Sequence, residues 1–273
     1  MGWRKPFKDR PMIMGILNVT PDSFYDGGQF PDRETAVLHA LRMVDEGADI
    51  IDIGGESTRP YAQPTPLNEE LQRVIPVIEG IRAASDVLIS VDTYKASVAR
   101  EALGAGANMI NDISGLTYDR EMAAAAADHG CPVVLMHIKG TPRDMQADPY
   151  YDDVVVEIME FFRERLDYAA QSGISRENII LDPGFGFGKR VEDNLRILKE
   201  LDRFKALGYP LLVGTSMKST IGKVTDSPAF EERVEGTMAS VAVALMNGAD
   251  IVRVHDVKRT RKVAMFVQAV MKA

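Results

Sequence analysis

Residues 46–50, Glu-Gly-Ala-Asp-Ile, return almost unchanged at residues 247–251 as Asn-Gly-Ala-Asp-Ile, and a related Gly-Ala-Gly-Ala-Asn lies between them at residues 104–108. Each copy is typical of a helix that ends at a glycine and turns directly into a strand, because glycine adopts the left-handed conformation that closes many helices. A corner that recurs along one chain indicates a repeated structural unit.

Around these corners, short apolar runs alternate with helix-like segments eight times. The runs are continuous in Ile, Val, Leu and Met, as in parallel strands that are buried on both faces. We predict strands at residues 12–17, 49–53, 87–91, 108–110, 133–136, 179–181, 211–213 and 251–254. The helices are predicted at residues 34–46, 69–83, 95–103, 121–129, 154–172, 192–206, 230–247 and 257–271, with Ser227-Pro228 as cap and first position of the seventh.

The number of units and the repeated corner decide the fold, because a doubly wound open sheet would show the same local pattern. Eight units in 273 residues favour an α/β TIM (β/α)8 barrel, a parallel eight-stranded barrel with outer helices. No linker or charge block interrupts the sequence, so we expect one domain over residues 1–273.

The composition of the chain indicates which classes of partner it binds and in which cellular compartment we expect it. A formal net charge of -8 makes nucleic acid and anionic membranes poor partners. No apolar run approaches the ~20 residues that cross a bilayer, and residues 1–10 lack the apolar core of a signal peptide. Pro6 stands where a myristoylation signal needs Ser or Thr. Cys131 is the only cysteine, so we expect no internal disulfide and a reducing, cytoplasmic compartment.

Each predicted strand ends in a polar or charged residue. In a parallel barrel, the carboxyl ends of all strands meet on one rim, so these endings are expected to form one site. They are Asn18, residues 54–59, Asp92, residues 111–112, His137, Asp182, residues 216–218 and residues 253–256.

Three of the endings suit a flat heterocycle. Asp92, Asn111 and Asp182 would place two carboxylates and an amide in an apolar mouth, where they are costly unless paired. A ligand edge with adjacent N–H donors would pair with a carboxylate through two hydrogen bonds. Each acid taken alone could instead be a helix cap or an ion-pair partner.

A second set of endings suits phosphate. Arg59, Lys218, Arg253 and His255 bring cationic or N–H donor groups near the hydroxyl of Ser219. The four histidines are too dispersed for a convincing metal site, although His137 and His255 are rim candidates.

The glycine-rich residues 184–189 resemble a phosphate-binding loop only superficially. The stretch is one residue short of that motif and lacks its final Ser or Thr. We expect a tight turn that brings Phe185 or Phe187 near a flat ligand. Residues 18–28 combine an amide, hydroxyls and acids around Pro21, and could be a functional loop or simply a capped turn.

Several motifs in order give the sequence a resemblance to the dihydropteroate synthases over nearly its whole length. They are Asn-Val-Thr-Pro-Asp-Ser-Phe at 18–24, Gly-Glu-Ser-Thr-Arg-Pro at 55–60, Val-Asp-Thr at 91–93, Asn-Asp-Ile-Ser-Gly at 111–115, Met-His at 136–137, Lys-Gly-Thr-Pro at 139–142, Met-Gln at 145–146, Asp-Pro-Gly-Phe-Gly-Phe-Gly-Lys at 182–189 and Arg-Val-His-Asp-Val at 253–257.

The resemblance implies that 6-hydroxymethyl-7,8-dihydropterin diphosphate condenses with 4-aminobenzoate to give 7,8-dihydropteroate and pyrophosphate, by Mg²⁺-assisted loss of pyrophosphate and amine attack. For the pterin, the resemblance implies contacts from Asp92, Asn111, Asp182, Lys218 and Met136. For the diphosphate, it implies contacts from Arg59, Arg253 and His255, with Asn18 as the protein ligand of Mg²⁺. For the aminobenzoate, it implies contacts from Thr58, Phe187 and Ser219. Phe24 and Asp26 would lie on a mobile first loop, and together with Lys218, Arg253 and His255 would take part in catalysis. A homodimer and a sulfonamide-binding site are also implied.

Two positions depart from the family pattern. Met217 stands where relatives usually carry Arg, and Tyr61 where a Gly is common. Two other functions remain open at this point. One is a pterin-binding methyltransferase, which needs neither the diphosphate cluster nor the first-loop motif. The other is a catalytically silent barrel that binds pterin or serves as a partner subunit.

Overall fold

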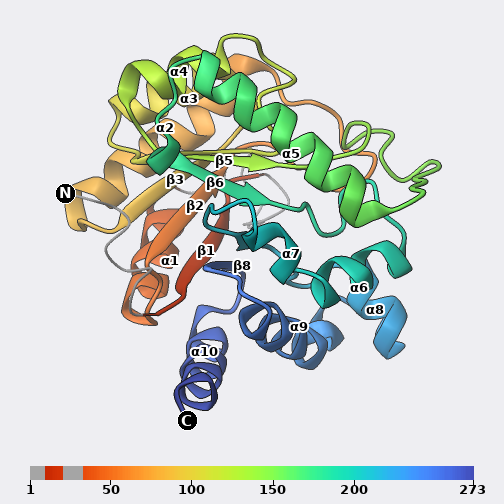
Figure 1. Cartoon of the computed structure of the whole chain (residues 1–273). Helices are drawn as coiled ribbons and strands as arrows, with labels where there is room; N and C mark the ends of the chain where they lie inside the picture. Colours follow the sequence, from red (N-terminus) through yellow and green to blue (C-terminus); the bar gives the residue numbers. More distant parts are fainter. Residues whose placement is uncertain (1–9, 21–32) are drawn as a thin grey trace.

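Eight parallel strands form the centre of the protein. The computed structural model describes residues 10–20 and 33–273, and Figure 1 shows the strands surrounded by helices. Neighbouring strands follow the order β6-β5-β4-β3-β2-β1-β8-β7, and a parallel bridge between Leu181 and Leu211 joins β6 to β7. The strands are β1 (Met12–Asn18), β2 (Ile50–Gly54), β3 (Leu88–Asp92), β4 (Met109–Asp112), β5 (Val133–Met136), β6 (Ile179–Asp182), β7 (Leu212–Val213) and β8 (Ile251–Val254). The predicted barrel is confirmed.

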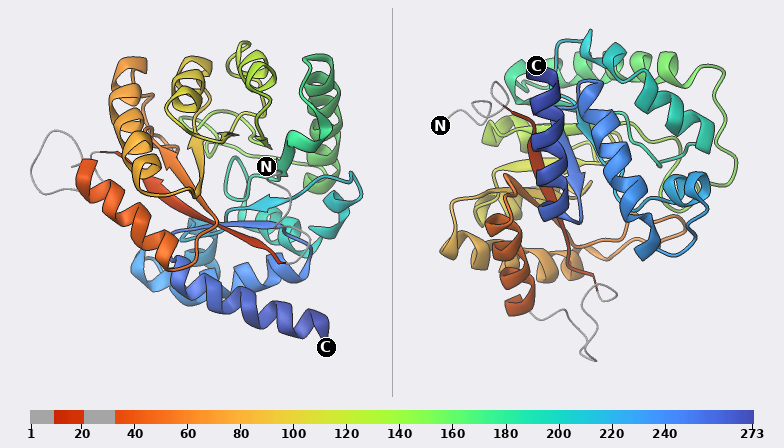
Figure 2. Two further views of the ribbon diagram at one scale, coloured as in Figure 1. Left: turned by 90° about the vertical axis from the view of Figure 1, so that its left-hand side faces the viewer. Right: turned by 90° about the horizontal axis from the view of Figure 1, so that it is seen from below.

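The helices pack around the outside of the strands, as the two views in Figure 2 show. Apolar side chains fill the space between the two layers, because each helix buries one face against strands that are apolar on both sides. The helices are α1 (Arg33–Asp45), α2 (Leu67–Ala84), α3 (Ala96–Gly104), α4 (Met122–His129), α5 (Val154–Gln171), α6 (Val191–Lys199), α7 (Asp202–Lys205), α8 (Ser219–Thr225), α9 (Val234–Met246) and α10 (Val257–Lys272).

Most predicted boundaries agree with the structure to within a few residues, but two predictions are wrong and one short helix was missed. The single helix predicted at 192–206 is divided into α6 and α7, because Glu200 leaves the helical conformation at φ -110° and ψ 25°. The short helix α8 was not predicted; it has seven residues, too few for a periodic signal. Ser227-Pro228 does not begin the seventh helix, since a 3-10 turn at Glu231–Arg233 leads into α9.

The repeated corner has one structural function in all three copies. The side chains of Asp49, Asn108 and Asp250 accept hydrogen bonds from backbone N–H groups of a neighbouring strand or its start, at 2.9, 2.8 and 2.7 Å. A cationic side chain also binds each of them: Arg10, Arg82 and Lys205, respectively. The three corners thus tie adjacent strands together at the amino-terminal end of the barrel.

The barrel interior changes from apolar to polar along the strands. At the amino-terminal end, the inward side chains form an apolar cluster of Met12, Met14, Ile50, Met109, Val134, Ile180, Leu212 and Ile251. Because side chains alternate along a strand, the next inward positions lie two residues further on. They are Asp52, Asn111, Asp182 and Arg253, so the polar group forms at the carboxyl ends.

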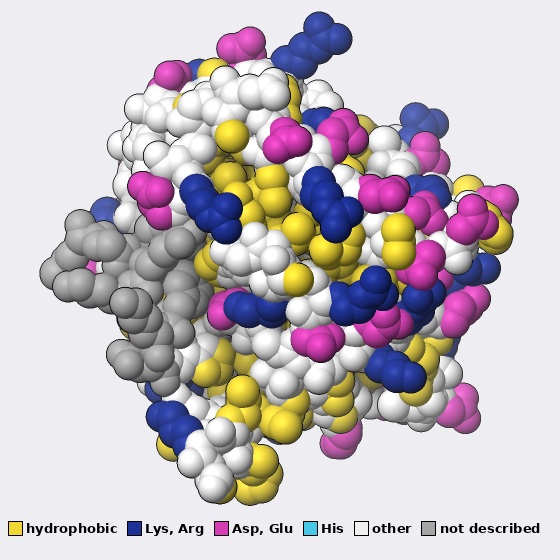
Figure 3. Space-filling model, viewed as in Figure 1, with side chains coloured by type: hydrophobic (Ala, Val, Ile, Leu, Met, Phe, Trp, Pro, Cys, Tyr) yellow, Lys and Arg dark blue, Asp and Glu magenta, His cyan; other side chains and the backbone are white. Residues whose placement is uncertain are grey.

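The outer surface carries charges of both signs. On the face drawn in Figure 3, Lys and Arg side chains are interspersed with Asp and Glu, so that opposite charges offset one another locally. None of the described helices is long and apolar enough to cross a bilayer.

Candidate active site at the mouth of the barrel

The guanidinium of Arg253 lies between two carboxylates. Its Nε donates to Oδ2 of Asp52 and its Nη2 donates to Oδ2 of Asp92, both at 2.6 Å. The side-chain amide of Asn111 donates to the same oxygen of Asp52 at 3.0 Å. Four strands, β2, β3, β4 and β8, therefore place four polar side chains in one bonded group, which we call the mouth cluster: Asp52, Asp92, Asn111 and Arg253.

Asp52 is the residue that sequence reasoning missed. Its side chain is completely buried, and its second oxygen, Oδ1, has no hydrogen-bond partner among the described residues. The signal was present in the sequence, because Asp52 follows the inward-facing Ile50 by two residues in an otherwise apolar strand. A lone acid at an inward position of a buried strand needs a cation, and Arg253 provides it.

Burial makes the carboxyl of Asp92 a weak acid. Removal from water raises the pKa of Asp92 to about 7, with Arg253 opposing the shift and Asp52 adding to it. Burial lowers the pKa of Arg253, but the carboxylates of Asp52 and Asp92 more than offset this effect, so the pKa is raised and the guanidinium stays charged. Burial and the second carboxylate thus favour the protonated form of Asp92, whereas Arg253 favours the carboxylate.

Asp182 and Lys218 form a second polar pair beside the mouth cluster. Asp182 accepts a hydrogen bond from the backbone N–H of Gly184 at 2.7 Å, and burial raises its pKa although Lys218 opposes the shift. Burial lowers the pKa of Lys218 to about 7. Its ammonium donates to the Phe185 carbonyl and lies 4.4 Å from the centre of the Phe187 ring. Lys218 is thus held by the glycine-rich turn.

The glycine-rich turn of residues 184–189 has the tight conformation expected from its sequence. Gly184 has a φ of +68°, and a methyl group on it would lie 1.9 Å from the carbonyl oxygen of His137. Phe185 is buried in the core, whereas Phe187 is half-buried against Lys218. Of the two aromatic candidates, Phe187 is therefore the one left beside the mouth, where Met136 of β5 also lies next to Asp182 of β6.

The two histidine candidates have different positions. Nδ1 of His255 lies 2.9 Å from the hydroxyl of Ser216, and burial together with nearby Arg253 lowers the pKa of His255 to about 4. His137, in contrast, is buried behind the turn with Nδ1 at 2.9 Å from Nζ of Lys189. The rim candidate His137 is thus a buried residue in contact with the glycine-rich turn.

The second loop is anchored through Glu56, another residue that sequence reasoning left without a function. Its carboxylate accepts hydrogen bonds from the Tyr94 hydroxyl at 2.6 Å and from the backbone N–H of Thr65 at 2.9 Å, and it pairs with Lys95. Thr58 is half-buried and Arg59 is exposed on this loop.

Both departures from the family pattern lie in the left-handed region. Tyr61 has a φ of 67° and Met217 a φ of 60°. The backbone N–H of Met217 donates to Oγ1 of Thr237 at 3.0 Å, and its carbonyl accepts from Arg233 at 2.9 Å. These two contacts hold Met217 in a conformation that costs a non-glycine residue about 1 kcal/mol or more.

The remaining candidates lie at the edge or outside the described residues. Asn18 ends β1 opposite Gly54 of β2, and Ser219 is exposed at the first position of α8. Phe24 and Asp26 lie outside the described residues. Within residues 10–20 and 33–273, no three His, Cys, Asp or Glu side chains are grouped as a metal site.

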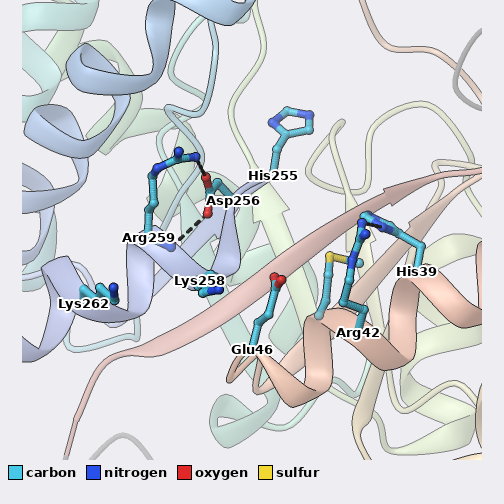
Figure 4. A pocket seen from close by; sticks show the side chains of 9 residues that line it. His39, Arg42, Glu46, His255, Asp256, Lys258, Arg259 and Lys262 are labelled. Atoms are coloured by element: carbon cyan, nitrogen blue, oxygen red, sulfur yellow. Dashed lines mark hydrogen bonds and ion pairs between the residues drawn. The ribbon is translucent and has the colours of Figure 1, made fainter.

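A separate cavity of about 550 Å³ lies on the outside of the barrel, between α1 and the first turns of α10 (Figure 4). It touches the mouth only through His255, and two of its cations already have partners: Arg42 contacts His39, and Arg259 pairs with Asp256. The rest of its lining consists of Met43, Glu46, Lys258 and Lys262.

Comparisons with known proteins agree on one group of relatives. The sequence profile of the family described as pterin binding enzyme matches residues 14–255. The dihydropteroate synthase of Synechocystis sp. is 51% identical over 260 residues, which are 95% of this chain and 90% of that relative. The solved dihydropteroate synthase of Xanthomonas albilineans with 4-aminobenzoic acid has a TM-score of 0.92 at 48% identity and covers 97% of this chain and 94% of its own. The structure of that enzyme in complex with 7,8-dihydropteroate has a TM-score of 0.88 at 46% identity and covers 97% and 95%.

Proposed function

Because the chain belongs to the pterin binding enzymes and, within them, to the dihydropteroate synthases, we propose that it condenses 6-hydroxymethyl-7,8-dihydropterin diphosphate with 4-aminobenzoate. The products are 7,8-dihydropteroate and pyrophosphate, so the enzyme is a transferase. The observation that carries the proposal is the mouth cluster, in which Arg253 lies between two carboxylates beside Asn111.

Hydrogen bonds from several side chains bind the pterin ring and determine its orientation. Because Asn111 gives its N–H to Asp52, its amide oxygen is left as the acceptor for a ring N–H. The carboxylates of Asp92 and Asp182 accept from other N–H donors of the ring, and the ammonium of Lys218 donates. Met136 provides apolar contact. Asp52 itself is a positioning residue, since it orients both Asn111 and Arg253.

The departing diphosphate is bound by the cationic side of the mouth. Arg253 uses two of its five N–H donors within the mouth cluster, which leaves three for phosphate oxygens. Arg59 and His255 add further donors. If the hydroxyl of Ser216 donates its hydrogen bond to Nδ1 of His255, the neutral ring carries its proton on Nε2. Stabilising the charge that develops on the leaving group is the main contribution of these side chains to the rate.

Magnesium fits this arrangement with one protein ligand. Mg²⁺ keeps several waters and takes oxygen ligands from one or two side chains plus substrate phosphates. A single amide oxygen, that of Asn18 at the end of β1, is compatible with such a site. When bound, the ion would offset negative charge on the diphosphate.

The second substrate needs placement more than activation. An aromatic amine is neutral at pH 7 and a weak nucleophile, so it gains most from being held in line with the reacting carbon. Phe187 offers its ring, and Thr58 and Ser219 offer hydroxyls from the surrounding loops. Phe24 and Asp26 would complete the site and exclude water, which would otherwise attack the pterin cation.

We further propose that the protein is a cytoplasmic homodimer. Cys131 is buried and unpaired, as suits a reducing compartment. Apolar side chains on the neighbouring helices α9 and α10 are unusually exposed, notably Met246 at 51% and Phe266 at 72%. Such side chains favour a protein interface. Light scattering of purified protein should give the mass of a dimer, and Phe266→Lys should lower it; a monomeric wild type would contradict the dimer.

The reaction is tested directly. Purified protein is supplied with the pterin diphosphate, Mg²⁺ and 4-aminobenzoate while pyrophosphate and dihydropteroate are measured. Both products should appear in equal amounts, and chelation of Mg²⁺ should slow them. Asp182→Ala should weaken pterin binding, and Arg253→Ala should slow turnover. A folded protein that forms neither product would contradict the proposed function.

A further inference from the structure

Lys189 is a buried cation whose hydrogen bonds are all directed at one turn and at the strand end beside it. Its Nζ lies 2.9 Å from Nδ1 of His137, 3.3 Å from the His137 carbonyl, 3.0 Å from the Gly184 carbonyl and 2.9 Å from the Phe187 carbonyl. An ammonium has three N–H donors, and the three shortest of these contacts are those with Nδ1 and with the carbonyls of Gly184 and Phe187. None of these partners, all in the described part of the chain, is a carboxylate. Its function is therefore not that of a structural salt bridge.

The acceptor role of His137 follows from the same geometry. Burial lowers the pKa of the Lys189 amine well below its usual value. In its protonated form Lys189 cannot accept a hydrogen bond, so in that form Nδ1 of His137 is the acceptor and the ring carries its proton on Nε2. Burial and the neighbouring Lys189 both lower the pKa of His137, which keeps the ring neutral. The ring is fixed in orientation by an edge contact with Phe161, whose centre lies 4.9 Å away.

Two of the three carbonyls that Lys189 binds, those of Gly184 and Phe187, flank the part of the turn that contacts Lys218. Gly184 precedes Phe185, whose carbonyl accepts from the Lys218 ammonium, and Phe187 places its ring 4.4 Å from the same ammonium. Other contacts hold the turn from its outer side: Gly186 bonds to Gln146 and Asn194. Of these contacts, only those of Lys189 involve a residue before Phe185 in the chain, Gly184, and a residue after it, Phe187.

We propose that Lys189, with His137 as its acceptor, is a positioning residue that sets where Phe185 and Phe187 hold Lys218. Through these two residues it would determine both the placement of the pterin-facing ammonium and the aromatic wall beside 4-aminobenzoate. This inference rests on the proposed function, since it assigns Phe187 and Lys218 to the two substrates. A displacement of about 1 Å in such a site can cost about a hundredfold in rate.

A matched pair of substitutions separates this function from general packing. His137→Asn keeps an oxygen acceptor near the position of Nδ1, whereas His137→Leu has a similar size and no acceptor. Lys189→Met removes the donor and keeps the unbranched chain. Lys199→Met, at an exposed position of α6, serves as the control.

In steady-state assays, we expect His137→Asn and Lys199→Met to stay within about twofold of wild type. The Leu and Met variants at His137 and Lys189 should raise the KM for 4-aminobenzoate and lower kcat by about tenfold or more. If His137→Leu and His137→Asn behave alike, or if all folded variants keep wild-type constants, the proposal is overturned.

Hydrogen exchange tests the same contact without turnover. Peptides covering residues 184–188 should exchange faster in His137→Leu and Lys189→Met than in wild type, and at the wild-type rate in His137→Asn. Unchanged exchange in His137→Leu would overturn the proposal even if Lys189→Met fails to fold. A wild-type protein that makes no dihydropteroate would instead contradict the proposed function, so the two failures are distinguishable.

Discussion

Arg253 donates from Nε to the carboxylate of Asp52 at 2.6 Å, although 201 residues separate them in the chain. Arg253 lies on the last strand of the barrel and Asp52 on the second, with β1 between them. The contact forms only when the ring of strands is closed on this side. Assembly of the active site and closure of the barrel are therefore coupled through one ion pair.

Replacing Arg253 should affect both stability and turnover. Arg253→Met would leave Asp52 and Asp92 buried without their cation, which we expect to lower the free energy of unfolding by about 3 kcal/mol. Turnover should fall by about a hundredfold or more, because a donor to the leaving group is lost. Urea unfolding and product formation measure the two effects. Arg259→Met, on the exposed side of α10, should change stability by less than about 0.5 kcal/mol; equal effects of the two substitutions would contradict the assignment.

The proton on Asp92 should make stability depend on pH. The pKa of Asp92 is about 7 in the folded protein, above its value of about 4 in an unfolded chain. The folded state therefore holds this proton where the unfolded state does not, and the stabilisation is complete below pH ~4 and lost as the pH rises to ~7.

We expect the unfolding free energy of wild type, relative to Asp92→Asn, to fall with rising pH between about 4 and 7, by at most about 1.4 kcal/mol per pH unit. Above that range, Asp92 should make no further difference. Urea titrations at several pH values measure the trend. A difference that does not vary with pH would mean that Arg253 keeps Asp92 ionised throughout.

Gly184 should tolerate no side chain. Gly184→Ala places a methyl group 1.9 Å from the His137 carbonyl, in addition to the strain at a φ of +68°. We expect a loss of about 3 kcal/mol or more in the free energy of unfolding. Gly130→Ala is the matched control: its φ is +57° and its surroundings are open, so it should cost only about 1 kcal/mol. Equal losses would show that backbone strain alone decides both.

Tyr61 should gain from replacement by glycine. Its φ of 67° is unfavourable for a tyrosine, and its side chain is 66% exposed, so little packing is lost in Tyr61→Gly. We expect a stabilisation of about 1 kcal/mol. Tyr150→Gly, at an exposed tyrosine outside the left-handed region, should destabilise the protein. Thermal unfolding compares the two, and a destabilised Tyr61→Gly would mean that the second loop depends on the ring.

The sequence predicted the strands and the end of the barrel at which the site forms, because both depend on local patterns. Continuous apolar runs mark strands buried on two faces, and polar residues directly after them mark the rim. Asp92, Asn111, Asp182 and Arg253 were found in this way. The position of a residue along its own strand does not predict how deep its side chain lies in the barrel, however, because that depth depends on how neighbouring strands are staggered.

The residues that the sequence misplaced or missed also depend on packing between distant parts of the chain. His137 follows its strand as a rim residue would, but its ring is buried in contact with Phe161 and Lys189. Asp52 lies inside the strand, so a search for strand endings passed over it. The left-handed conformations of Tyr61 and Met217 arise from contacts with Pro142 and Thr237, which are distant in the chain. No local pattern reveals them.

The corners formed by Asp49, Asn108 and Asp250 lie at the opposite end of the barrel from every residue proposed to bind substrate. Changes in heat resistance and changes in substrate choice should therefore be separable by mutation. Substitutions at the corners could therefore raise stability while the residues at the mouth, and with them the choice of substrate, stay unchanged.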